Sequence, residues 1–173
     1  MCEYKEILLD VINKYQDANK WIDSTFEQMK RLSNSKVGDV GQDFIEDLCT
    51  KLNFQCEFPE ENGKRARKSP WDIKINGIEF ELKTATEDVS GAFQFNHIRY
   101  HRPYEAVLCL GIAPNEIVFD IWSKAEIATG KAGNLVSMEK NANASFKLTK
   151  KKNSLKSIGK FNITLTEFIE NFS

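Results

Sequence analysis

The order of hydrophobic and polar residues divides the 173-residue chain into helical and extended parts. Up to about residue 52, apolar residues recur at steps of three and four, which is typical of helices that bury one face. Residues 3–33 are therefore expected to form one or two helices that act as a packing layer. A further helix is predicted from Val37 to Leu52, with a cap within residues 33–35.

Beyond residue 70 the period of the pattern changes to two. Residues 59–70 are polar and charged and are expected to form a loop. Trp71, Ile73 and Ile75 then alternate with polar residues, and a second alternating run covers residues 78–83. Asn76-Gly77 between the two runs is typical of a two-residue type I′ turn, so the sequence predicts a β-hairpin here.

The rest of the chain adds strands and a closing helix. Strands are predicted at 104–112 and 116–122, with a turn between them at 113–115, and a short helix at 123–130. Residues 134–160 are expected to be irregular and basic, and a last helix to start at about Thr164. Helices before and after a central mixed sheet predict an α/β fold. The length suits one domain, 1–173.

Composition and charge narrow the function classes only partly. No apolar run reaches the roughly 20 residues that span a bilayer, and the first residues lack the order of a signal peptide, so a cytoplasmic protein without a membrane partner is expected. The four cysteines lack zinc-binding spacing and are expected to be reduced. Residues 1–61 carry a net charge of −6 and residues 62–173 a net charge of +5, so the second part could face phosphate groups.

The predicted hairpin carries the candidate chemistry. Counting outward from Asn76-Gly77 places Asp72 opposite Glu81, with Lys83 on the same face. Directly paired residues have Cβ atoms about 4.5–5.5 Å apart, so the two carboxylates could share one Mg²⁺ ion. An ammonium beside them could orient or deprotonate a water and offset phosphate charge, which suits phosphodiester hydrolysis. The alternative is a solvated hairpin face whose charges pair with one another.

Several short motifs around this hairpin resemble one enzyme superfamily. The order Ser69-Pro70-Trp71-Asp72, eight further residues, and Glu81-Leu82-Lys83 is similar to the signature of the PD-(D/E)XK nucleases. The resemblance covers about residues 36–122, between an N-terminal helical segment, 1–35, and a basic and helical C-terminal segment, 123–173. It implies a restriction-endonuclease-like core in which Asp72, Glu81 and Lys83 are catalytic and the two carboxylates hold Mg²⁺.

The helix before the hairpin also resembles its counterpart in the superfamily. The stretch from Lys36 to Leu48 has the family's glycines, but Gln42 stands where a glutamate is common, and Glu46 follows one turn later on the same face. The resemblance implies that one of these two residues joins the active site. We expect Glu46 to be an outer metal ligand and place Gln42 second.

Candidate DNA contacts flank the motifs. Lys64, Arg65, Arg67 and Lys68 precede Asp72 and could bind phosphates. Lys150, Lys151 and Lys152 belong to a second basic stretch. A dense set of side chains could recognise bases: Gln94, Asn96, His97, Arg99, His101 and Arg102.

Together these features predict a Mg²⁺-dependent endonuclease acting on double-stranded DNA, most similar to small type II restriction enzymes. That resemblance implies a homodimer, because palindromic duplex is conveniently cut by a two-fold pair of sites, and a cognate DNA methyltransferase. Two alternatives stay open: a structure-selective nuclease such as a repair or Holliday-junction enzyme, and a DNA-binding module without activity.

Overall fold

A six-stranded mixed sheet forms the centre of the molecule. The computed structural model describes residues 3–15, 19–141 and 144–172. The strands follow the spatial order β1 (Cys56–Glu57), β4 (Ile73–Ile75), β5 (Ile78–Thr86), β7 (Ala106–Ile112), β8 (Ile117–Ser123) and β11 (Lys156–Ser157). β5 and β7 pair in parallel and the other neighbours pair antiparallel, so the predicted mixed sheet is confirmed.

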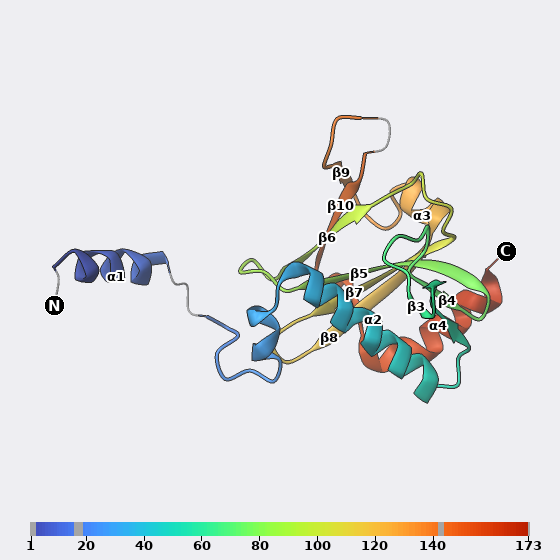
Figure 1. The fold of residues 1–173 in the computed structure, drawn as a ribbon, viewed down its shortest axis with the longest axis horizontal. Helices are drawn as coiled ribbons and strands as arrows, with labels where there is room; N and C mark the ends of the chain where they lie inside the picture. Colours follow the sequence, from blue (N-terminus) through green and yellow to red (C-terminus); the bar gives the residue numbers. More distant parts are fainter. Residues whose placement is uncertain (1–2, 16–18, 142–143, 173) are drawn as a thin grey trace.

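Two helices cover one face of this sheet (Figure 1). Alternation along β5 directs Phe80 and Leu82 to this face, where they pack with α2 (Asn34–Lys51) and α4 (Phe161–Asn171). Ile45 of α2 is fully buried in this cluster, and the Phe80 and Phe168 rings lie 5.9 Å apart. Burial of this apolar area is the main force that holds the helices on the sheet.

A second, smaller sheet covers the opposite face. It consists of β6 (Ala92–Ile98), β10 (Phe146–Lys151) and β9 (Leu135–Ser137), in that spatial order. Phe93 and Phe95 of β6 pack with residues of β7 and β8 and with Ile127 of the short helix α3 (Lys124–Ala128). The central sheet therefore lies between a helical layer and a layer of strands, and the predicted α/β class is confirmed.

The predicted hairpin is present with the predicted turn. Asn76 and Gly77 have φ values of 45° and 86°, the left-handed conformation that a type I′ turn requires. The pairs Ile75–Ile78, Lys74–Glu79 and Ile73–Phe80 follow the predicted register. Asp72 departs from it, because its N–H donates to the Phe80 carbonyl and the ladder ends at Ile73.

Most other predicted elements have close counterparts. The cap of α2 is Ser33, whose hydroxyl accepts the N–H of Lys36, and α4 begins at Phe161, slightly before the predicted start. The predicted loop at 59–70 contains a small hairpin of β2 (Glu60–Glu61) and β3 (Lys64–Arg65). Its turn, Asn62-Gly63, has the same composition as the turn that the sequence analysis recognised at residues 76–77.

The expectation of an irregular segment at 134–160 is wrong. This part of the chain forms β9, β10 and β11, with short turns of 3-10 helix η2 (Lys152–Ser154) and η3 (Ile158–Lys160). The strand β10 has only one fully buried apolar residue, Leu148, so its sequence shows little of the alternation that identifies strands. Pairing with β6 and β9 supplies the order that the local pattern does not indicate.

The expected N-terminal packing layer is wrong for its first helix. Helix α1 (Glu3–Tyr15) forms, but it lies apart from the sheets (Figure 1), and Tyr4 and Leu8 are 78% and 59% exposed. Farther along the chain Trp21 is buried, and residues 27–31 form a turn of 3-10 helix, η1 (Glu27–Arg31). Among the described residues, no helix is both long and apolar enough to cross a membrane.

Candidate active site

Strand β5 carries two of the predicted catalytic residues side by side. Glu81 and Lys83 point to the face opposite α2, and the Lys83 ammonium lies 2.8 Å from Glu81 Oε1. Their neighbours on the parallel strand β7 are Val107 and Cys109, both fully buried. The ion pair thus lies on the edge of an apolar cluster.

Glu81 is enclosed. It is only 2% exposed, unlike a residue of the solvated hairpin face that the sequence analysis left open as the alternative. The chain after β6 covers it, because the N–H of Arg99 donates to Glu81 Oε2 at 3.4 Å and the buried Tyr104 phenol lies beside the carboxylate. Burial raises the pKa of Tyr104, and the neighbouring Glu81 carboxylate adds to the rise.

Asp72 reaches the same place from the other strand of the hairpin. Its Oδ2 accepts the N–H of Leu82 at 2.8 Å, which fixes the carboxylate next to the middle of β5. Burial raises the pKa of Asp72, and the charge of Glu81 adds to that rise, whereas Lys83 and the Leu82 N–H oppose it. The charges of all three predicted catalytic residues therefore act on one another.

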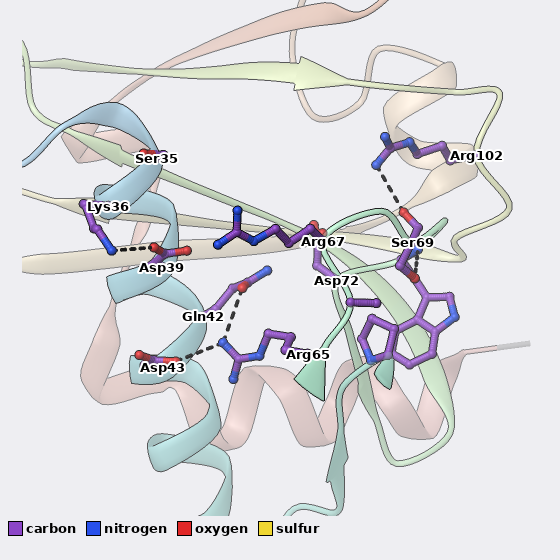
Figure 2. Close-up of a pocket in the computed structure, with 13 residues that line it drawn as sticks. Ser35, Lys36, Asp39, Gln42, Asp43, Arg65, Arg67, Ser69, Asp72 and Arg102 are labelled. Carbon is purple, nitrogen blue, oxygen red and sulfur yellow. Dashed lines mark hydrogen bonds and ion pairs between the residues drawn. The ribbon is translucent and has the colours of Figure 1, made fainter. Parts of the chain in front are cut away.

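Asp72 lines a cavity of about 740 Å³ between α2 and the loop before the hairpin. We call it the Asp72 cavity (Figure 2). Gln42 faces it from α2, Arg67 extends across it from the loop, and Arg102 closes one side with a hydrogen bond to the Ser69 carbonyl. Arg67 is exposed, and among the described residues its guanidinium has no carboxylate partner, so its charge is available to a ligand.

Arg65 connects the loop before the hairpin to α2. Its guanidinium contacts Gln42 at 3.4 Å, Asp43 at 2.9 Å and Glu46 at 2.9 Å, and it lies over the Phe58 ring. These contacts occupy the charge that we expected to meet DNA phosphate. They also hold Glu46 away from the Asp72 cavity, which Gln42 lines. The geometry therefore favours Gln42 over Glu46 as the helix residue nearest Asp72.

Lys83 lines a second cavity, of about 470 Å³, which we call the Lys83 groove. Its walls come from the start of α2, the second half of β5 and the strand β6. Three of the predicted base-contacting residues lie along it: Gln94, Asn96 and His97. The first turns of α2 border both cavities, through Lys36 and Gln42 on one side and Gly38 on the other.

The donor set suits a divalent ion held by two carboxylates. Glu81 Oε1 is buried and accepts no hydrogen bond of good geometry, although Lys83 lies close to it. Asp72 has an oxygen besides Oδ2, and a cation would favour the ionised form that burial disfavours. Within the described residues, no group of three or more His, Cys, Asp or Glu side chains gathers around one point. An ion here would take Asp72 and Glu81 and complete its shell with water and substrate, as Mg²⁺ commonly does.

The remaining predicted DNA contacts are dispersed. Lys64 and Lys68 are exposed and line neither cavity, and Lys152 forms an exposed ion pair with Glu116 at 3.8 Å. Lys150 points inward, donating to the Ala132 carbonyl at 2.7 Å and lying over the Trp122 ring. Its neighbour Lys151 is exposed. Lys150 therefore does not fit the phosphate contact that the sequence analysis gave it.

Two site residues escaped the sequence analysis. Tyr104 is buried beside Glu81, although in the sequence it belongs to a predicted strand with no polar role. Gly41 lies where α2 crosses β5, and a Cβ there would be 1.8 Å from Thr84 Oγ1. The spacing Gly38-x-x-Gly41 hinted at a close approach, but only the packing shows which of the two glycines requires it.

Comparisons with known proteins add little to this geometry. No protein-family model and no curated protein sequence matches the chain. Among solved structures, it is similar to the bacterial homing endonuclease I-Ssp6803I, with 9% identity and a TM-score of 0.46. The likeness covers 82% of this chain and 100% of that chain. The fold and the geometry of the site define an α/β domain with a charged site at a β-hairpin.

Proposed function

We propose that the protein is a Mg²⁺-dependent endonuclease that hydrolyses phosphodiester bonds in double-stranded DNA. The observation that carries the proposal is geometric: the Asp72 carboxylate accepts the N–H of Leu82, the residue between Glu81 and Lys83, whose side chains form an ion pair at 2.8 Å. The alternative of a solvated hairpin face fits poorly, because Glu81 is buried and forms an ion pair with Lys83.

The residues divide the chemistry between them. Asp72 and Glu81 would hold Mg²⁺, which supplies a Lewis acid that offsets charge on the scissile phosphate. Lys83, partly exposed in its groove, orients an attacking water and stabilises negative charge that develops on the phosphate oxygens. Gln42 completes the polar wall of the Asp72 cavity.

Duplex DNA is the substrate that the surroundings favour. Arg67 and Arg102 line the Asp72 cavity together with Asp72, and cations in this position can bind phosphates that flank the cleaved bond. We further propose that cleavage is sequence-specific, of the type II restriction class. On this proposal a homodimer provides one site per strand, and a cognate methyltransferase protects the host's own sites.

A plasmid-cleavage assay tests the proposal directly. The intact protein, incubated with supercoiled and linear plasmid, should cut with Mg²⁺ and should not cut in EDTA. Glu81→Gln and Lys83→Gln, which keep side-chain size, should each lower the rate roughly 100-fold or more, because each removes a charge used in the transition state. Sequencing of the ends would show whether one sequence is cut.

The same hairpin supplies a matched control. Lys74 and Glu79 form a half-buried ion pair, 3.4 Å apart, on the face that also carries Glu81. Glu79→Gln and Lys74→Gln should leave cleavage unchanged. Full activity in Glu81→Gln would refute the site, and preferential cutting of four-way junctions would replace the restriction-type proposal by a structure-selective nuclease.

A further inference from the structure

The outer face of the small sheet has the features of a DNA-binding surface. β6 and β10 are paired antiparallel with Phe95 opposite Leu148 and Gln94 opposite Thr149. Because side chains alternate across a strand, the first pair points into the core and the second points outward. One face of this ribbon is thus apolar and buried, and the other is polar and exposed.

A bulge in β6 increases the number of polar groups on the outer face. Ile98 pairs with Phe146 and Phe95 with Leu148, so Asn96 and His97 together lie opposite the single residue Lys147. His97 has a φ of 60°, and both Asn96 and His97 are exposed. In a regular strand one of two consecutive side chains would point to the core, whereas here both face outward.

The outer face is continuous with the candidate active site. Gln94, Asn96 and His97 line the Lys83 groove together with Lys83 itself. A duplex whose backbone reached Lys83 would therefore pass these three side chains. β6 and β10 lie in the outer layer of the molecule (Figure 1), and Gln94, Asn96 and Thr149 on their outer face are exposed.

We propose that the outer face of β6 and β10 recognises base pairs in the major groove of duplex DNA; this inference rests on the proposed function. A two-stranded ribbon fits the width of the major groove, and Gln and Asn side chains can make two hydrogen bonds to adenine. Lys151, and Lys147 opposite the bulge, supply positive charge for the flanking phosphates. An acidic group lies nearby, since Asp88 accepts from the Gln94 amide at 3.4 Å and orients it.

Base recognition can be tested without cleavage. The intact protein is incubated in Ca²⁺, which is expected to support binding without cutting, with a library of duplexes of random sequence, and the bound fraction is sequenced. Wild type should enrich a short sequence. Gln94→Ala and Asn96→Ala should each relax the preference at one or two positions by roughly 5- to 150-fold, with affinity for unselected duplex unchanged.

Gln28→Ala is the matched control for these variants, because Gln28 is exposed and lines neither the Asp72 cavity nor the Lys83 groove. It should keep the wild-type preference. If Gln94→Ala and Asn96→Ala keep it too, or if wild type enriches no sequence or prefers duplex RNA, the inference is wrong. These results are independent of whether the protein cuts, so a failed cleavage assay would refute the proposed function separately.

Two adjacent lysines of β10 test which face of the ribbon contacts DNA. Lys151 is exposed, whereas Lys150 is held inward by the Ala132 carbonyl. Lys151→Ala should lower the dependence of log K on log salt concentration by about 1, as expected for loss of one phosphate contact. Lys150→Ala should leave that slope unchanged. Equal effects of the two variants, or no effect of Lys151→Ala, would contradict the proposed orientation of the ribbon.

Discussion

The contact between Gly41 and Thr84 decides how closely α2 can approach β5, and the change Gly41→Ala tests it. A Cβ at position 41 would lie 1.8 Å from Thr84 Oγ1 and 2.8 Å from Thr84 Cβ. The hydroxyl can rotate away, but the Cβ is fixed to the backbone of β5. Relief therefore requires the helix and the strand to separate beside Lys83.

The expected destabilisation follows from two opposed effects. Overpacking in a rigid contact costs about 1–3 kcal/mol, and the fixed Thr84 Cβ places this case near the upper end. Replacement of glycine by alanine inside a helix stabilises the helix by about 1 kcal/mol, because alanine has the higher helix propensity. The net loss should be about 2 kcal/mol, which corresponds to a decrease in Tm of roughly 4–8 °C for a chain of this size.

Gly38→Ala provides the control within the same helix. A Cβ at position 38 meets no atom within 4 Å, so this variant should gain up to about 1 kcal/mol from helix propensity alone. Thermal and urea denaturation of both variants measure the difference. Thr84→Ala removes two of the three atoms near position 41 and should recover part of the loss when combined with Gly41→Ala. Equal stability of Gly41→Ala and Gly38→Ala would refute the close approach.

Three further predictions concern charges at the site. Asp72→Asn should abolish cleavage, yet it should raise the Tm of the metal-free protein at pH 7 and not at pH 3. Burial raises the pKa of Asp72 in the folded state above its value in the unfolded state, so the ionised carboxylate destabilises the fold only at the higher pH. Equal shifts in Tm at both pH values would contradict this. Arg65→Ala should lower the free energy of unfolding, measured by urea denaturation, by about 1 kcal/mol, and should make residues 59–70 accessible to protease. Lys64→Ala should do neither. The double variant Glu81→Leu with Lys83→Met should be inactive but at least as stable as wild type, and a large loss in Tm would show that the ion pair has a structural role.

Local patterns were sufficient to predict the hairpin and its register. Asn76-Gly77 requires two consecutive left-handed residues, and that requirement fixes which residues of the two strands face each other. The register then places Glu81 and Lys83 on one face of β5 without any knowledge of the rest of the fold. It does not hold at Asp72, because the carboxylate of this residue binds the Leu82 N–H and the ladder ends before it.

Features that depend on distant segments could not be predicted in this way. The burial of Glu81 depends on the chain that carries Arg99 and Tyr104, and no local pattern in β5 indicates that this chain returns over it. The inward direction of Lys150 depends likewise on Ala132, which lies in a different loop. The exposed helix α1 has the amphipathic pattern of a packed helix, and its sequence alone does not show whether a partner surface exists.

The enclosed position of Glu81 and Lys83 is itself an argument for a functional site. Burial of an ion pair removes both groups from water, and replacement by apolar residues is often neutral or stabilising. Neighbouring β7 has Val107 and Cys109 at the paired positions, so the fold accommodates apolar side chains there. A fold that nevertheless keeps this ion pair next to two cavities, with the Asp72 carboxylate bound to the Leu82 N–H beside it, fits the chemistry that we propose for those charges.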